Sequence, residues 1–152
     1  MIKMVVTDLD GTLLSSNSDY SSKDLSTLHR LGEMGVIRVI ATGRSPYSAS
    51  KVIPNDFPID YLVFSSGAGI IRWSDKSIVY TTELDSTKVQ ELIDLFVDLK
   101  VDFMVQEPIP QNHIFHYHFS GNPNPDFDRR LAVYKDFCSP LILGVPYPDN
   151  AT

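Results

Sequence analysis

The chain has 152 residues, of which 43% are apolar and 21% are charged, so it can bury a hydrophobic core and is too apolar to be disordered. Its 13 basic and 19 acidic residues give a net charge of −6, which disfavours a general nucleic-acid or anionic-membrane surface. Cys138 has no second cysteine to pair with, and no apolar run approaches the roughly 20 residues of a membrane span. These features predict a soluble, cytoplasmic protein that binds neither nucleic acid nor membrane.

The first half of the sequence alternates between short apolar runs and helical patterns. Strands are predicted at Ile2–Thr7, Val36–Ala41 and Tyr61–Phe64, and a hairpin at Ile70–Trp73 and Ser77–Thr81. Ser21 or Ser22 can cap a helix that lies between the first two strands, and Ser45–Val52 predicts a short helix before the third. This alternation predicts an α/β fold with a doubly wound parallel sheet.

The second half differs in composition from the first. Residues 1–80 carry no net charge, whereas residues 81–152 carry all of the net −6 and most of the prolines. The change predicts two domains, 1–82 and 83–152. In the second, helices are predicted from Asp85 or Ser86 and at Asp126–Phe137, and strands at Phe103–Gln106, Ile114–Phe119 and Leu141–Val145. This order predicts a small α+β unit.

Two carboxylates, Asp8 and Asp10, stand directly after the first predicted strand in the run Asp8-Leu9-Asp10-Gly11-Thr12. Ligands of a doubly wound sheet bind at the carboxyl ends of its strands. There, one carboxylate can attack phosphorus or bind a cation while the other transfers a proton. An Asp-x-Asp pair can also merely cap a turn, but the preceding apolar strand and the following Gly-Thr favour a catalytic pair.

A second polar turn, Ala41-Thr42-Gly43-Arg44-Ser45, follows the second predicted strand. A hydroxyl and glycine-exposed backbone amides at a strand-to-helix turn suit a phosphoryl oxygen. Taken alone, this segment is an ordinary turn. Because neighbouring parallel strands end at the same edge, we expect Thr42 to lie beside Asp8.

With these two motifs and the loop Ser65–Ile70, the sequence resembles the haloacid-dehalogenase-like (HAD) phosphatase superfamily, and most closely its Cof-type sugar-phosphatase branch. The resemblance covers residues 1–82 closely and the remainder in outline. It implies a Rossmann-type core sheet with a small α+β cap inserted after the third strand. The loop differs from the family pattern at Ser66, where the family often has Asn.

The resemblance implies a Mg²⁺-dependent phosphatase of small phosphorylated metabolites, foremost sugar phosphates. Asp8 is expected to form an aspartyl-phosphate, and Asp10 to act as general acid and base. The Asp8 carboxylate and the Asp10 carbonyl are the implied metal ligands. Phosphate or substrate binding is implied for Leu9, Thr42, Gly43 and Arg44. For Arg44 two roles remain as alternatives: contact with the substrate, or packing at the cap hinge.

Two parts of the family pattern, a lysine and an acidic cluster downstream of the cap, have no counterpart in this sequence. We therefore expect core and cap to be incomplete, and the 152-residue chain to be weakly active or inactive. Ile2–Thr7 would then be an edge strand through which the chain could self-associate. The alternative is a non-catalytic, phosphate-binding regulatory protein. A phosphoacceptor signalling domain ranks low, because Ser65-Ser66-Gly67 stands where such a domain needs an aspartate.

Three histidines lie close together at His113, His116 and His118. In a strand, His116 and His118 share a face and His113 lies on the other. A zinc site, a role in substrate contact and an aromatic sheet face with half-exposed histidines are all open, and the last is the default expectation.

Overall fold

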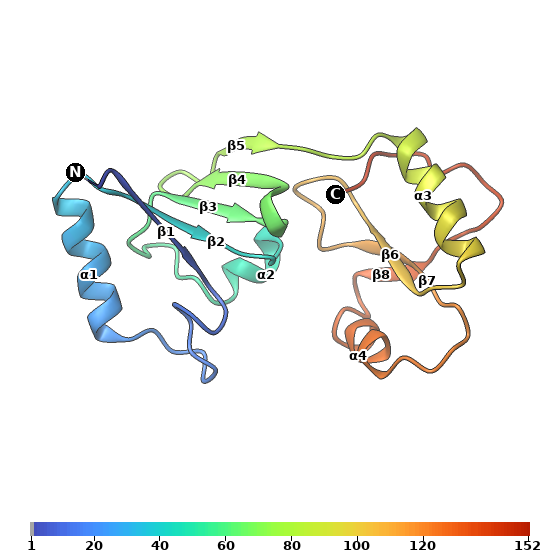
Figure 1. Ribbon diagram of the computed structural model, residues 1–152, viewed down its shortest axis with the longest axis horizontal. Helices are drawn as coiled ribbons and strands as arrows, with labels where there is room; N and C mark the ends of the chain where they lie inside the picture. The colour runs from blue at the N-terminus through green and yellow to red at the C-terminus, as the bar shows by residue number, and fades with distance from the viewer. Residues whose placement is uncertain (1) are drawn as a thin grey trace. The chain divides into compact units, whose positions relative to one another are not determined.

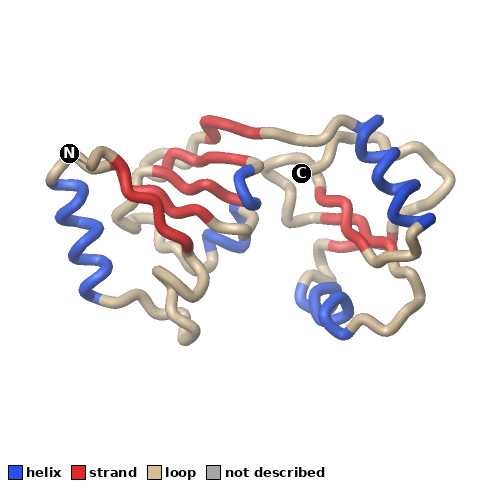
Figure 2. The backbone as a smooth tube through the Cα atoms, viewed as in Figure 1, coloured by secondary structure: helices blue, strands red, loops and turns tan. Residues whose placement is uncertain are grey.

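The computed structural model describes residues 2–152, and the chain forms two compact units (Figure 1). One unit ends at Thr82, and the other spans Glu83–Thr152. Each unit has its own sheet and its own helices (Figure 2).

The first unit is built on a five-stranded sheet. Its strands are β1 (Met4–Asp8), β2 (Ile37–Ala41), β3 (Tyr61–Phe64), β4 (Gly69–Arg72) and β5 (Ile78–Thr81). They lie in the order β1-β2-β3-β4-β5; β1, β2 and β3 are parallel, β4 is antiparallel to β3, and β5 is antiparallel to β4. The predicted α/β fold with a parallel core is confirmed, and the hairpin makes the complete sheet mixed.

The helices of the first unit begin where the sequence supplies capping side chains. α1 (Ser22–Glu33) starts after Ser21, whose hydroxyl accepts a hydrogen bond from the backbone N–H of Asp24 at 3.0 Å. α2 (Pro46–Ser50) starts after Ser45. A 3₁₀ turn, η1 (Ser65–Gly67), follows β3. Capped N-termini satisfy backbone donors that the helix itself leaves unpaired, so these starts could be predicted.

The core of the first unit includes side chains from β2, from β3 and from the turn after β1. Leu9, Ile40, Leu62 and Phe64 are almost completely buried. β1, by contrast, lies at one end of the strand order, so its predicted edge position is confirmed. Its side chains Met4 and Val6 are 51% and 57% exposed, which is unusual for a strand of a parallel sheet.

The second unit packs two helices with a three-stranded sheet. Its elements are α3 (Ser86–Asp98), β6 (Phe103–Gln106), β7 (Phe115–His118), α4 (Pro125–Val133) and β8 (Cys138–Pro140). β7 is antiparallel to β6 and parallel to β8. A hydrophobic core joins α3 to the sheet and to the C-terminal segment through Val89, Ile93, Val105, Tyr147 and Ala151.

Two predictions for the second unit were wrong. The strand expected at Leu141–Val145 lies earlier, at Cys138–Pro140, because the backbone turns away after Leu141 and Gly144 adopts a φ of 80°. The helix expected at Asp126–Phe137 ends at Val133, and Phe137 leads into β8 instead. The apolar residues that follow Val133 keep the helical spacing but lie in a turn. Sequence periodicity alone does not distinguish such a turn from a continuing helix.

The segment near the C-terminus has a partner that the sequence did not reveal. Leu84 and Ala151 exchange backbone hydrogen bonds of 2.8 and 3.0 Å, and Ala151 is buried. Within residues 2–152, none of the helices combines the length and apolar character that crossing a bilayer requires.

Candidate active site at the ends of β1 and β2

The first motif forms a tight turn at the carboxyl end of β1. Asp8 is the last residue of the strand and stands opposite Ala41 of β2. The turn is closed by the backbone N–H of Leu14, which donates to the carbonyl of Leu9 at 2.8 Å. Gly11 has a φ of 77°, which a residue with a side chain adopts only with strain. The glycine therefore allows the chain to leave the strand and fold back over it.

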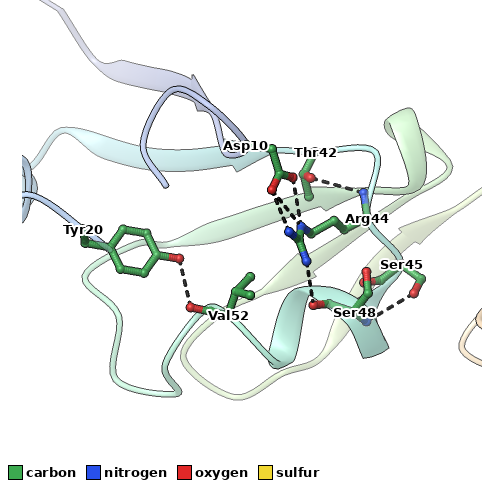
Figure 3. A network of polar contacts seen from close by, with 7 residues as sticks. All are labelled: Asp10, Tyr20, Thr42, Arg44, Ser45, Ser48 and Val52. Carbon is green, nitrogen blue, oxygen red and sulfur yellow. Dashed lines mark hydrogen bonds and ion pairs between the residues drawn. The ribbon is translucent and has the colours of Figure 1, made fainter. Parts of the chain in front are cut away.

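The carboxylate of Asp10 is paired with the guanidinium of Arg44 (Figure 3). Arg44 Nε lies 3.1 and 2.9 Å from the two carboxylate oxygens, and Arg44 Nη2 lies 2.7 Å from Oδ1. Arg44 Nη1 also donates to the backbone carbonyl of Ser48 at 3.4 Å. The arginine is thus anchored to α2 and clamps the carboxylate with two nitrogens. Such bidentate pairs are stronger and more directional than single contacts.

This ion pair governs the ionisation of Asp10. Hydrogen bonding from Arg44 lowers the pKa of the Asp10 carboxyl, and its positive charge and a contact with the Thr42 hydroxyl add to the effect. Partial burial opposes the shift. The Asp10 side chain remains 49% exposed, so solvent and a substrate can reach it.

The second motif brings the loops after β2 and β3 together. The Thr42 side chain is buried, and its oxygen accepts a hydrogen bond from the backbone N–H of Arg44 at 3.2 Å. The backbone N–H of Ser66 donates to the Thr42 carbonyl at 3.1 Å, and that of Ser65 to the Arg44 carbonyl at 2.9 Å. A Cβ added at Gly43 would lie 3.4 Å from Ser66 Oγ, which is close to ordinary van der Waals contact.

The carboxylate of Asp8 is exposed at the same edge. The Thr12 hydroxyl donates to Asp8 Oδ2 at 3.3 Å. Among the described residues Asp8 forms no ion pair, in contrast to Asp10. The charge of the Asp10 carboxylate is therefore neutralised by a cation, and that of Asp8 is not. The two carboxylates can consequently play different chemical roles.

The donor set at this edge fits a hard divalent cation. Asp8 contributes a carboxylate, and the backbone carbonyl of Asp10 accepts no hydrogen bond from another residue in the range 2–152. Mg²⁺ prefers such oxygen ligands and retains several waters. Two protein ligands are an incomplete shell, and no group of three or more acidic, histidine or cysteine side chains gathers around a metal site in the described chain.

The structure brings most of the sequence-predicted site residues together. Leu9 takes part through its backbone only, because its side chain is fully buried. Arg44 pairs with Asp10, a role that neither sequence alternative included. Tyr20, which the sequence did not single out, donates to the Val52 carbonyl at 3.0 Å, and its hydroxyl is near enough for the charges of Arg44 and Asp10 to act on it. No local motif marks Tyr20, since it reaches the site from the far end of a Ser-rich loop.

Within residues 2–152, the histidines of the second unit contact aromatic and polar side chains and belong to no group of three or more potential metal ligands. His118 stacks near Phe103, with ring centroids 5.2 Å apart, and His113 packs against Phe137 at the same distance. His116 bonds to Glu107 and Ser139 instead. The default expectation of an aromatic face with half-exposed histidines agrees with these contacts.

Comparison with known proteins places this arrangement in a family. The family model described as haloacid dehalogenase-like hydrolase matches residues 5–136. The chain belongs to the haloacid dehalogenase-like hydrolases. The predicted family is thereby confirmed.

Several relatives of this HAD-family chain have known names or structures. It is 32% identical over 117 residues to the 5-amino-6-(5-phospho-D-ribitylamino)uracil phosphatase YitU of Bacillus subtilis, covering 76% of this chain and 43% of that protein. The HAD phosphatase BT1666 of Bacteroides thetaiotaomicron is 21% identical with a TM-score of 0.72, covering 94% of this chain and 50% of that one. The HAD subclass IIB sugar phosphatase BT4131 has a TM-score of 0.60 at 21% identity, covering 89% and 48%. The chain therefore spans about half the length of these relatives.

Proposed function

We propose that this chain carries the nucleophile, the acid–base group and part of the phosphate site of a Mg²⁺-dependent phosphatase. Its substrates would be small phosphorylated metabolites in the cytoplasm, foremost sugar phosphates. The observation that carries the proposal is the placement of Asp8, Asp10 and Thr42 at one edge of the sheet, where Asp10 is paired with an arginine and Asp8 forms no ion pair with another described residue. The phosphatase names of the relatives support the same reaction.

The first step would transfer the phosphoryl group to the protein. A carboxylate oxygen of Asp8 attacks phosphorus, the ester P–O bond breaks, and Asp10 gives its proton to the departing oxygen. An aspartyl-phosphate and the free alcohol result. Asp8 is suited to attack because it is exposed and forms no ion pair with a cationic side chain among the described residues.

The second step would release phosphate. The Asp10 carboxylate takes a proton from water as the water oxygen attacks phosphorus, and the bond from phosphorus to Asp8 breaks. Arg44 favours the ionised Asp10 that this step needs. The same ion pair opposes protonation in the first step, so the Arg44–Asp10 contact must weaken when Asp10 acts as an acid.

Thr42 would hold the transferring phosphoryl group. Its oxygen already accepts a hydrogen bond from the backbone N–H of Arg44, which orients the hydroxyl. The hydroxyl can then donate a hydrogen bond to a phosphoryl oxygen. The amides of Leu9 and Gly43 can add donors at the same edge. Mg²⁺, held by the Asp8 carboxylate and the Asp10 carbonyl, would neutralise phosphoryl charge.

The experiment that tests the proposal does not depend on turnover. Beryllium fluoride with Mg²⁺ mimics an aspartyl-phosphate, and its bound form can be followed by ¹⁹F NMR. We expect a bound signal in the wild-type chain that disappears in Asp8→Asn and weakens in Thr42→Ala. Asp75→Asn, an exposed carboxylate in the β4–β5 turn, is the matched control. An undiminished signal in Asp8→Asn would contradict the proposal.

A non-catalytic phosphate-binding protein is the second candidate. It is favoured by the incomplete metal shell, because no group of three or more acidic, histidine or cysteine side chains gathers at a metal site within the described residues. Hydrolysis of p-nitrophenyl phosphate with Mg²⁺ separates the two candidates. Activity in the wild type that is lost in Asp8→Asn selects the enzyme, whereas hydrolysis that persists unchanged in Asp8→Asn removes Asp8 from the mechanism and argues against the enzyme.

A further inference from the structure

A chain of hydrogen bonds in the second unit joins three side chains from separate segments. Glu107, which follows β6, lies with Oε1 3.0 Å from Nε2 of His116 on β7. Nδ1 of His116 lies 2.9 Å from Oγ of Ser139 on β8. A carboxylate can only accept, so Nε2 carries a hydrogen, and in the neutral imidazole Nδ1 accepts from the Ser139 hydroxyl. The imidazole is thus fixed in one tautomer and one orientation.

These three residues line one cavity of about 480 Å³, which is within the size range of small-molecule sites. Two further polar residues, Tyr147 and Asp149, lie in its lining. The remaining walls are apolar: Pro140, Leu141, Ile142, Val145, Pro146 and Pro148. Apolar walls with a few convergent polar groups are typical of a site for a small organic ligand.

Tyr147 adds an unused polar group to this cavity. The residue is only 8% exposed, and its hydroxyl makes no hydrogen bond with another described residue. Burial, together with the charges of Glu107 and Asp149, raises the pKa of Tyr147 to about 12. The phenol therefore stays protonated at neutral pH and can serve a ligand as donor or acceptor.

The charge of the cavity determines which ligand it favours. Two acidic residues, Glu107 and Asp149, line it, and no lysine or arginine of the described chain does. One oxygen of Glu107 bonds to His116, and the other has no hydrogen-bond partner among residues 2–152. A phosphate group would be repelled here, whereas an ammonium group would be attracted and could bond to Glu107.

We propose that this cavity binds a small organic cation, an amine attached to an apolar or aromatic body. The ammonium group lies against Glu107 and Asp149, and the body packs on the proline and aliphatic walls. The His116–Ser139 pair holds the Glu107 carboxylate in place and offers the Ser139 oxygen as a further acceptor. The site lies wholly within the second unit, so it is independent of the phosphatase proposal.

A hydrogen-bonded Ser–His–Glu chain is also found in enzymes that catalyse acyl transfer through a nucleophilic serine. In acyl-transfer enzymes with a nucleophilic serine, the backbone N–H of the following residue commonly stabilises the oxyanion. The residue after Ser139 is Pro140, which has no N–H. The structure thus favours binding over acyl transfer, and a test can separate them.

Benzylamine is a suitable probe, with benzoate and benzyl alcohol as its anionic and neutral counterparts. We expect saturable benzylamine-induced shifts of the backbone amides of Glu107, His116 and Ser139 in ¹H–¹⁵N NMR spectra, recorded without Mg²⁺ or phosphate. Benzoate should produce none, and benzyl alcohol should bind more weakly. Glu107→Gln should weaken benzylamine binding about tenfold or more, since a charge-assisted bond is lost. Glu91→Gln, on the exposed surface of α3, should leave it unchanged.

The proposal is overturned if benzylamine causes no saturable shifts in a wild-type chain with a dispersed, folded spectrum. It is also overturned if benzoate binds equally well, or if Glu107→Gln retains wild-type affinity while its spectrum remains dispersed. Covalent labelling of Ser139 by a fluorophosphonate, detected by intact mass, would also overturn the amine-binding proposal and would support acyl transfer at Ser139. Loss of beryllium fluoride binding in Asp8→Asn bears only on the phosphatase proposal.

Discussion

The guanidinium of Arg44 clamps both carboxylate oxygens of Asp10 across the edge of the sheet, at distances of 2.7 to 3.1 Å. The two residues are far apart in sequence and come from the turns that follow β1 and β2. Because of this contact, the two carboxylates of the Asp-x-Asp pair differ in their electrostatic surroundings. The sequence alone does not show this difference. The contact also ties the ionisation of Asp10 to the position of a single side chain.

The first prediction concerns this ionisation. Because Arg44 lowers the pKa of Asp10, Arg44→Gln should raise it. A ¹³C NMR titration of the Asp10 carboxyl carbon measures the midpoint directly. Arg72→Gln removes a comparable arginine that pairs with Asp75 in the hairpin, so it should leave the Asp10 midpoint in place. An unchanged midpoint in Arg44→Gln would show that the ion pair does not control this carboxyl group.

The second prediction concerns the ion pair between Arg38 and Asp60, which connects β2 to the residue before β3. Both oxygens of Asp60 accept from Arg38, with its backbone N–H at 2.7 Å and guanidinium nitrogens at 3.0 and 2.9 Å. The Arg38 side chain is 16% exposed. Asp60→Asn should lower the free energy of unfolding by about 1–3 kcal/mol, measured by urea denaturation. Asp75→Asn, in an exposed pair, should cost less, because solvent screens exposed ion pairs.

The same pair predicts a pH dependence of stability. Hydrogen bonds from Arg38 hold the pKa of Asp60 below its usual value when the chain is folded. The unfolded chain then binds this proton more readily, so the contribution of the pair is complete above about pH 4 and is lost as pH falls toward the folded pKa. The acid limb of the stability curve should therefore be shallower in Asp60→Asn than in the wild type. Equal slopes would contradict this assignment.

Most of the first unit could be predicted from the sequence because its signals are local. Apolar runs indicated the strands, Ser21 and Ser45 indicated the helix starts, and the rule that parallel strands end together indicated the neighbourhood of Asp8 and Thr42. The partner of Arg44 could not be predicted, because it depends on where a long side chain points across two turns. The Glu107–His116–Ser139 chain was missed for a similar reason, since its members meet only once β6, β7 and β8 pair in register.

The third prediction tests the close packing of the hairpin on β3. Gly69 of β4 stands opposite Phe64, and a Cβ added to it would lie 2.1 Å from Phe64 Cζ. Phe64 is completely buried, so its ring has no free space to move into. Gly69→Ala should lower the free energy of unfolding by about 1–3 kcal/mol. Gly43→Ala meets only Ser66 Oγ at 3.4 Å and should cost less, so equal losses in thermal denaturation would argue against the steric cause.

The fourth prediction concerns self-association, which we propose occurs through the edge strand β1. The strand presents Met4 and Val6 to solvent, and edge strands with exposed apolar side chains are templates for pairing with another chain. Val6→Lys should therefore reduce the associated fraction of the 152-residue chain in sedimentation velocity, because a charge at an edge opposes pairing.

The opposite edge of the same sheet provides the control for that measurement. Val79 of β5 is 45% exposed, so Val79→Lys introduces the same charge at the other end of the strand order. If β1 is the pairing edge, Val79→Lys should associate as the wild type does. A wild-type chain that sediments as a monomer at high concentration, or equal effects of the two lysines, would show that the exposed face of β1 does not bind a second copy.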